Sequence, residues 1–255
     1  MVSNATITSM IAVIIYTFLL FAGFIFYNKR KTGIEIKPLI VGSIGFIVFT
    51  QVLEKLLHVI VITQFPNYAD YPVLFGLYGG MAAGLFEEVG RYILYAWLLN
   101  KYLDYKGGLS FGIGWGGIEA VVLALITILP NVIFAFLINA GTFEAAFAGQ
   151  LPSDQIALIK DSLINQGAGF YLFGIVERFF ALFMQIALSL FVLLAVVKNK
   201  ISYLIYSILV HALIDFPLAF FQTGDLNNIW IIEIYIAAIG ILSMFFIKRI
   251  KKSLS

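Results

Sequence analysis

The chain of 255 residues contains no cysteine, only two histidines and few charged residues. The absence of cysteine excludes disulfides, thiolate nucleophiles and thiolate metal ligands. Only 12% of the residues are charged, whereas a soluble domain carries roughly 25%. Because 62% of the residues are hydrophobic, we expect the chain to be an integral membrane protein with the lipid bilayer as its solvent.

The first apolar segment lacks the marks of a cleaved secretory signal. Residues 1–9 carry no side-chain charge, and the basic run 29–31 follows the segment instead of preceding it. A secretory signal begins with positive charge and ends in a small-residue cleavage site. We therefore expect this segment to remain as the first membrane span.

Seven apolar runs are long enough to span a membrane, which takes about 20 residues. They predict an all-α fold, a polytopic transmembrane helical bundle of about seven spans that forms a single transmembrane domain, 1–255. Pro130 in the fourth run is expected to kink that helix or to end its span. The runs cover residues 6–27, 38–62, 73–100, 109–139, 168–197, 201–221 and 229–247.

The basic residues divide the connections into two sides. Twelve of the sixteen follow the first, third, fifth and seventh runs, whereas Lys160 alone falls in the other connections. Because basic connections stay in the cytoplasm, the N-terminus is predicted outside and the C-terminus inside. These charges are topology signals, so we expect no nucleic-acid partner. The outer connection 141–166 is expected to form a short interfacial helix or lid.

Several ionisable residues lie inside the predicted spans, where each charge costs at least about 2.5 kcal/mol near the bilayer centre. Such residues normally face the bundle interior and have a partner. Glu87, Glu88, Glu119 and His211 lie at a similar depth on three different runs, which favours a functional site over helix-stabilising contacts. The full set is Glu54, Lys55, Glu87, Glu88, Arg91, Glu119, Glu177, Arg178, His211 and Asp215.

Helical spacing indicates which of these groups share a helix face. Arg91 follows Glu88 by three residues and Glu87 by four, so its guanidinium can reach either carboxylate. His211 and Asp215 are also four residues apart and lie on one face. Each pair is therefore expected to act together.

Two other groups favour structural roles or leave the role open. Glu54 lies next to Lys55 and four residues before His58, so it is expected to neutralise Lys55. Glu177 and Arg178 are adjacent and point in different directions on a helix, so each is expected to pair with a group on another helix.

The segment 112–119 places four glycines next to Glu119. Glycine lets a second helix backbone approach closely, and it would also leave room for an extended substrate chain. Trp115 lies on the same face as Glu119 because the two are four residues apart.

The residue types exclude most known routes to peptide cleavage inside a membrane. No serine has a suitable base in its surroundings, Asp215 is the only mid-span aspartate, and the H-E-x-x-H zinc motif is absent. What remains is a glutamate that activates water, assisted by His211 and a second polar group at the developing oxyanion.

Taken together, the motifs resemble the YhfC family of predicted bacterial intramembrane proteases. That family is related to the CAAX-prenyl-protease and bacteriocin-processing superfamily, whose signature is a paired glutamate with a downstream arginine, followed by histidine motifs on later helices. The resemblance extends from the first span to the last. It is carried by the segments 84–92, 112–120, 177–178 and 211–217, in this order.

The resemblance implies an intramembrane peptidase of the bacterial cytoplasmic (inner) membrane that cleaves a transmembrane or membrane-adjacent peptide. Glu87 or Glu88 would activate water, Arg91 would hold the carboxylates, and His211 with Asp215 would complete the polar pocket. With one mid-span histidine, a metal-free centre is favoured over zinc, so no cofactor is expected. The supporting positions are Trp115, Glu177, Arg178 and Gln185.

Two of these positions depart from the family pattern, in which histidine is expected at Trp115 and at Gln185. Tryptophan cannot accept a hydrogen bond, and glutamine cannot shuttle a proton. A catalytically impaired relative that binds transmembrane partners is therefore the alternative function. An ion-coupled transporter is a third, because buried carboxylates also mark transport pathways. The odd number of spans and the lack of inverted halves argue against transport.

Overall fold

The computed structural model describes residues 1–254, which are almost entirely helical and contain no strand. The predicted all-α fold is thus confirmed. Six helical segments are long and apolar enough to cross a membrane, as expected for a polytopic helical bundle. They are Asn4–Lys31, Ile36–Gln64, Tyr105–Asn139, Ala168–Val197, Ile201–Gln222 and Ile229–Ser253.

The third predicted run forms helix α4, Pro72–Trp97, which is 26 residues long. It has the length of a span, but Glu87, Glu88 and Arg91 lie in its interior. The count of seven spans, the orientation and the single domain therefore stay predictions. The other long helices are α1 (Asn4–Lys31), α9 (Ala168–Val197), α10 (Ile201–Gln222) and α11 (Ile229–Ile250).

Two of the long segments each contain a stretch of π-helix. Pro130 does not end its span, because the helix continues through it, with a wider π-helical stretch just before the proline. Such a stretch accommodates the ring and the missing N–H of proline. The first segment consists of α2 (Ile36–Phe46), η1 (Ile47–Glu54) and α3 (Lys55–Gln64), and the second of α5 (Tyr105–Leu123), η3 (Ala124–Ile128) and α6 (Leu129–Asn139).

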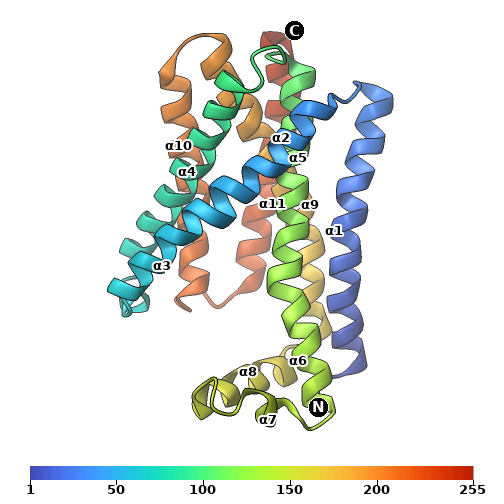
Figure 1. The fold of residues 1–255 in the computed structure, drawn as a ribbon, viewed down its shortest axis with the longest axis vertical. Coiled ribbons are helices and arrows are strands. Elements are labelled where there is room, and N and C mark those ends of the chain that lie inside the picture. Colours follow the sequence, from blue (N-terminus) through green and yellow to red (C-terminus); the bar gives the residue numbers. More distant parts are fainter. Residues whose placement is uncertain (255) are drawn as a thin grey trace. The chain divides into compact units, whose positions relative to one another are not determined.

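The chain divides into two compact units. The first, Met1–Ala22 with Ala120–Arg178, has an apolar core around Met10, Ala135 and Phe143, all fully buried. Its short helices α7 and α8 lie at one end of this unit (Figure 1). Both lie within the connection 141–166, so the prediction that this connection contains a short helix is confirmed. They are α7 (Phe143–Phe147) and α8 (Ser153–Asn165).

An ion pair joins α7 to α8. Lys160 donates a hydrogen bond to Glu144, and this contact lowers the pKa of the Glu144 carboxyl. Both side chains are exposed, so the pair aligns the two helices and contributes little to stability.

The second unit, Gly23–Glu119 with the chain from Phe179, is organised by the close packing of α4 on α10 (Figure 1). A Cβ atom at Gly80 would lie 2.5 Å from the Ala212 carbonyl oxygen, and one at Gly84 would lie 2.6 Å from that of Ile208. Small residues four apart thus let the two backbones touch. This contact brings the carboxylates that follow Gly84 against the middle of α10.

The glycines of α5 serve the same purpose. Gly112 and Gly116 pack against α9 at Ile186 and Gln185, and Gly114 packs against the backbone of α2 at Leu39. The space beside these glycines is filled by neighbouring helices. The expected close approach is confirmed, whereas the expected room for a substrate chain is absent beside these three residues.

Candidate active site

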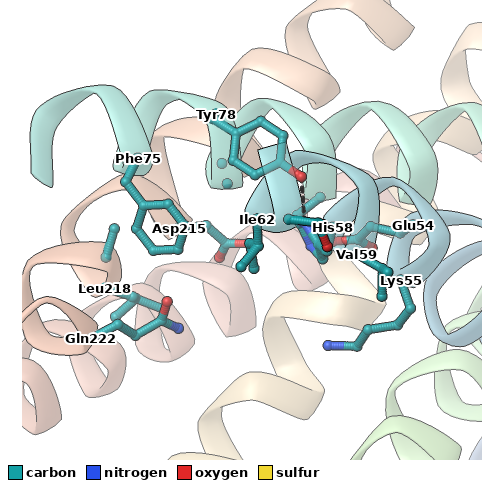
Figure 2. A pocket seen from close by; sticks show the side chains of 15 residues that line it. Glu54, Lys55, His58, Val59, Ile62, Phe75, Tyr78, Asp215, Leu218 and Gln222 are labelled. Atoms are coloured by element: carbon teal, nitrogen blue, oxygen red, sulfur yellow. Dashed lines mark hydrogen bonds and ion pairs between the residues drawn. The ribbon is translucent and has the colours of Figure 1, made fainter. Parts of the chain in front are cut away.

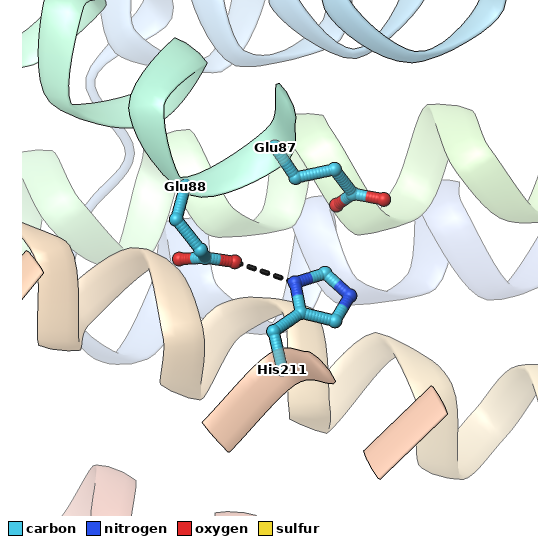
Figure 3. A group of neighbouring side chains, drawn as sticks. All are labelled: Glu87, Glu88 and His211. Atoms are coloured by element: carbon cyan, nitrogen blue, oxygen red, sulfur yellow. Dashed lines mark hydrogen bonds and ion pairs between the residues drawn. The ribbon is translucent and has the colours of Figure 1, made fainter. Parts of the chain in front are cut away.

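Glu88 lies at the centre of a buried polar network and is fully shielded from solvent. Nδ1 of His211 lies 2.7 Å from its Oε1 atom (Figure 3), and the Ser207 hydroxyl donates to its Oε2 atom over 2.7 Å. Arg91 also donates to Oε1. Both carboxylate oxygens of Glu88 are therefore occupied by partners from α4 and α10.

Only one of the two carboxylate oxygens of Glu87 accepts hydrogen bonds from the described residues. Its Oε2 atom accepts hydrogen bonds from Arg91 over 2.6 Å and from the indole N–H of Trp115 over 3.0 Å. Within residues 1–254, its Oε1 atom has no hydrogen-bond donor. The carboxylate is thus fixed in orientation while one of its oxygens is available to another molecule.

Arg91 connects the two glutamates to α5 and α9. It is fully buried and donates to Glu87, to Glu88 and to the side-chain oxygen of Gln185. Its guanidinium also lies 4.6 Å from the ring centroid of Trp115, a cation–π contact. The prediction that Arg91 reaches both carboxylates is confirmed.

His211 contacts a carboxylate through each ring nitrogen. Nδ1 faces Glu88, and Nε2 lies 3.4 Å from Oδ2 of Asp215, one helical turn further along α10. Asp215 is 26% exposed, whereas His211 is 1% exposed. The pairing of His211 with Asp215 is confirmed, and these contacts fix the imidazole in one orientation.

The predicted positions Trp115 and Gln185 belong to this network, although neither was expected to hold the central arginine. Trp115 donates to Glu87 and Gln185 accepts from Arg91. They lie where histidines were expected from the family pattern. At both positions, this chain thus has a side chain that binds the arginine–glutamate group.

Three other predicted residues do not belong to the close group formed by Glu87, Glu88 and His211. Glu119 is one of them and is 8% exposed. The expectation that Glu177 and Arg178 do not pair with each other is wrong, because Arg178 donates to Glu177. Both side chains are long enough to turn towards each other along the helix surface.

The expected pairing of Glu54 with Lys55 is also wrong. Oε1 of Glu54 lies 3.1 Å from Nε2 of His58, one turn further along the helix. Nδ1 of His58 lies 2.7 Å from the hydroxyl of Tyr78 on α4. The spacing of four residues favours this contact, whereas an adjacent residue on a helix points away.

Sequence reasoning missed Ser207, which is fully buried and binds Glu88. The one available signal was its position four residues before His211, on the same face of α10. Serine is common in membrane helices, so this spacing alone does not single it out.

Glu87, Glu88 and His211 also form a group that could hold a metal ion. One ligand atom from each residue lies within 4.8 Å of the other two. Carboxylate oxygens and imidazole nitrogens are both ligands of divalent metals, and catalytic zinc sites use three such protein ligands. In residues 1–254 this is the one group of three or more such residues with that geometry.

The chain resembles known proteins over most of its length. The chain is 35% identical over 238 residues to a Bacillus subtilis (strain 168) protein described as the uncharacterized membrane protein YhfC, with 92% of each chain covered. No solved structure matches the chain. The family model of the YhfC intramembrane metalloproteases matches residues 16–236. The chain therefore belongs to the YhfC intramembrane metalloprotease family.

Proposed function

We propose that the chain hydrolyses peptide bonds of membrane-embedded or membrane-adjacent segments, with Glu87 as the base that activates water. The observation that carries this proposal is the convergence of Glu87, Glu88 and His211, with ligand atoms mutually within 4.8 Å in a buried site. Family membership supports the same reaction class, since the family is described as a metalloprotease family.

The contacts favour Glu87 over Glu88 as the base. A general base must lie within hydrogen-bond reach of the proton that it removes. Both oxygens of Glu88 are occupied, by His211 and Arg91 on one side and by Ser207 on the other. Oε1 of Glu87 has no donor within residues 1–254, so it has the capacity to accept a proton from water.

His211 is the best-positioned group to donate a proton to the leaving nitrogen in the second half of the reaction. As the hydroxide adds to the carbonyl carbon, Glu87 takes the proton of the water. That proton must reach the leaving nitrogen as the C–N bond breaks, and His211 is a suitable carrier. Glu88 and Asp215 position its ring from the two nitrogens, as a carboxylate orients histidine in other hydrolases.

The residues present also fit a divalent metal. The prediction of a metal-free centre rested on the single mid-span histidine, but two carboxylates converge with it and complete a set of three ligands. The two carboxylates of Glu87 and Glu88 share the single positive charge of Arg91, and the excess of negative charge favours a further cation. Asp215 behind His211 is the type of partner that orients a histidine ligand. Glu87, Glu88 and His211 would hold the metal, which would supply a water of lowered pKa when bound. The roles of Glu87 as base and of His211 as proton carrier described above belong to the centre without metal.

The proposal is tested by cleavage of a panel of transmembrane peptides by the purified chain in liposomes. We expect cleavage by the wild type and a fall of about 10²- to 10⁴-fold for Glu87→Gln, the usual contribution of a general base. Glu35→Gln, which alters a partly exposed carboxylate paired with Lys106, is the matched control and should retain activity. Unchanged cleavage by Glu87→Gln would refute the role of Glu87.

A second candidate function is supported by Trp115 and Gln185. Both bind the Arg91–Glu87 group at positions where the family pattern leads us to expect histidine. In this alternative the chain binds transmembrane partners without cleaving them. Absence of cleavage by the wild type, with cleavage gained in a Trp115→His, Gln185→His double variant, would favour the alternative.

A further inference from the structure

A second polar site lies next to the candidate active site, in a cavity of about 640 Å³. The end of η1, α3, α4 and α10 form its walls, all within the second unit. Figure 2 shows the labelled side chains around it, including Glu54, His58 and Tyr78. None of these three residues has a role in the proposed reaction.

Asp215 connects this cavity to the reaction centre. Its side chain lines the cavity, and its Oδ2 atom lies 3.4 Å from Nε2 of His211. A group bound in the cavity would therefore contact the same carboxylate that contacts the imidazole. If the chain cleaves peptides, the cavity is placed to receive a substrate residue near the scissile bond.

Glu54 lines this cavity, and one of its carboxylate oxygens lacks a hydrogen-bond partner in the described chain. The residue is 6% exposed, and its Oε1 atom contacts His58, which in turn contacts Tyr78. Its Oε2 atom is buried and has no hydrogen-bond partner in the described chain, and no ion pair joins it to Lys55. A buried carboxylate oxygen without a donor is costly, so a ligand that donates a hydrogen bond would be bound favourably.

The backbone at Glu54 gives independent support. The residue is the last of the π-helical segment Ile47–Glu54. π-Helical geometry within an α-helix is rare and is found frequently at functional sites. The distortion thus occurs where a buried carboxylate lines the cavity.

The cavity fits a long basic side chain better than a metal ion. Its walls include the apolar residues Val59, Ile62, Phe75 and Leu218, which suit an aliphatic stem. Glu54 and Asp215 supply two negative charges against the single charge of Lys55. These two carboxylates do not belong to a close metal-binding group among residues 1–254.

We propose that this cavity is a specificity subsite that binds a lysine or arginine side chain of the substrate, with Glu54 as the acceptor for its charged end. The role of this cavity as a substrate subsite rests on the proposed peptidase function. Binding itself can be measured without cleavage.

The test uses two transmembrane peptides that differ at one position, lysine in one and norleucine in the other, with the position moved along a set of such pairs. Peptide binding is measured in liposomes with the chain carrying Glu87→Gln, which blocks the proposed cleavage. We expect the best lysine peptide to bind about tenfold or more tightly than its norleucine partner, the effect of one charge-assisted hydrogen bond.

Adding Glu54→Gln should reduce this preference to less than about twofold while the Kd of the norleucine peptide stays unchanged. That unchanged Kd shows that the variant is folded. Glu35→Gln is the matched control and should retain the full preference. Equal binding of the two peptides, or a preference that survives Glu54→Gln, would overturn the proposal.

Crosslinking to the chain without substitutions tests the same subsite and does not depend on the folding of a variant. A peptide that carries a photoreactive lysine analogue should crosslink to the cavity walls, at Val59, Ile62 or Phe75. Crosslinks confined to other parts of the chain would overturn the subsite. Cleavage of peptides without any preference that depends on Glu54 defeats this inference alone. Binding that depends on Glu54, without cleavage of any peptide, defeats the proposed function alone.

Discussion

Arg91 is the residue on which the candidate active site depends most. A guanidinium buried in a membrane protein is costly unless acceptors surround it. Arg91 is fully buried and donates to Glu87, Glu88 and Gln185, with the ring of Trp115 on one face. Its partners come from three helices, so it also fixes how those helices meet.

The two glutamates should differ when each is replaced by glutamine. Glu88→Gln removes the charge shared by Arg91, His211 and Ser207, so we expect it to lower the free energy of unfolding by about 3–5 kcal/mol. Glu87→Gln should lower the free energy of unfolding by less, because only one carboxylate oxygen of Glu87 accepts hydrogen bonds within the described chain. Thermal unfolding in detergent measures both variants, and a larger loss for Glu87→Gln would contradict the assignment of roles.

Metal binding is a second prediction at the scale of single residues. The ligand group of Glu87, Glu88 and His211 should bind about one divalent ion per chain, as expected for three protein ligands of this type. Elemental analysis of the purified chain measures the content, with His211→Ala as the variant expected to lose the ion. Glu35→Gln serves as the control. The same low metal content in all three proteins after incubation with zinc would argue against a metal site.

At the scale of helices, the contact of α4 with α10 places the reacting groups. Gly80 and Gly84 lie against carbonyl groups of α10, and Glu87 and Glu88 follow directly in the next turn. His211 lies on the facing part of α10. The distance between Glu88 and His211 therefore depends on how closely the two backbones approach.

Gly84→Val should separate these helices. Its side chain would meet the Ile208 carbonyl oxygen at a distance that real Cβ atoms do not tolerate, so we expect a loss of about 1–3 kcal/mol in stability together with loss of cleavage. The matched control is Gly23→Val on α1, where an added Cβ atom would have no neighbouring helix or side chain within 4 Å. Thermal unfolding and peptide cleavage measure the two variants, and equal behaviour would contradict the role of this contact.

At the scale of the whole molecule, the arrangement of the chain across the membrane is a prediction that the lack of cysteine makes easy to test. Single cysteines can be introduced at Ser3 and Ser253, which are both exposed. With seven spans and the C-terminus inside, a membrane-impermeant maleimide should label Ser3→Cys in intact cells and Ser253→Cys only after permeabilisation. Labelling of both from the same side would indicate an even number of spans.

The sequence alone determined the features that depend on composition and on neighbours along one helix. The low charge and the long apolar runs predicted a helical membrane protein, because lipid excludes most other structures. The reach of Arg91 to Glu87 and Glu88, and that of His211 to Asp215, followed from residues three and four apart. The motifs in their order also identified the family.

Only the tertiary structure decided which helices meet and which atoms of the polar residues remain available. The contact of Glu88 with His211 and Ser207, the partner of Glu54 and the unoccupied oxygen of Glu87 all depend on the rotation and register of packed helices. Those variables are set by close backbone contacts such as that of Gly84 with Ile208. Spacing along one helix carries no information about them, because it fixes only the face on which a side chain lies.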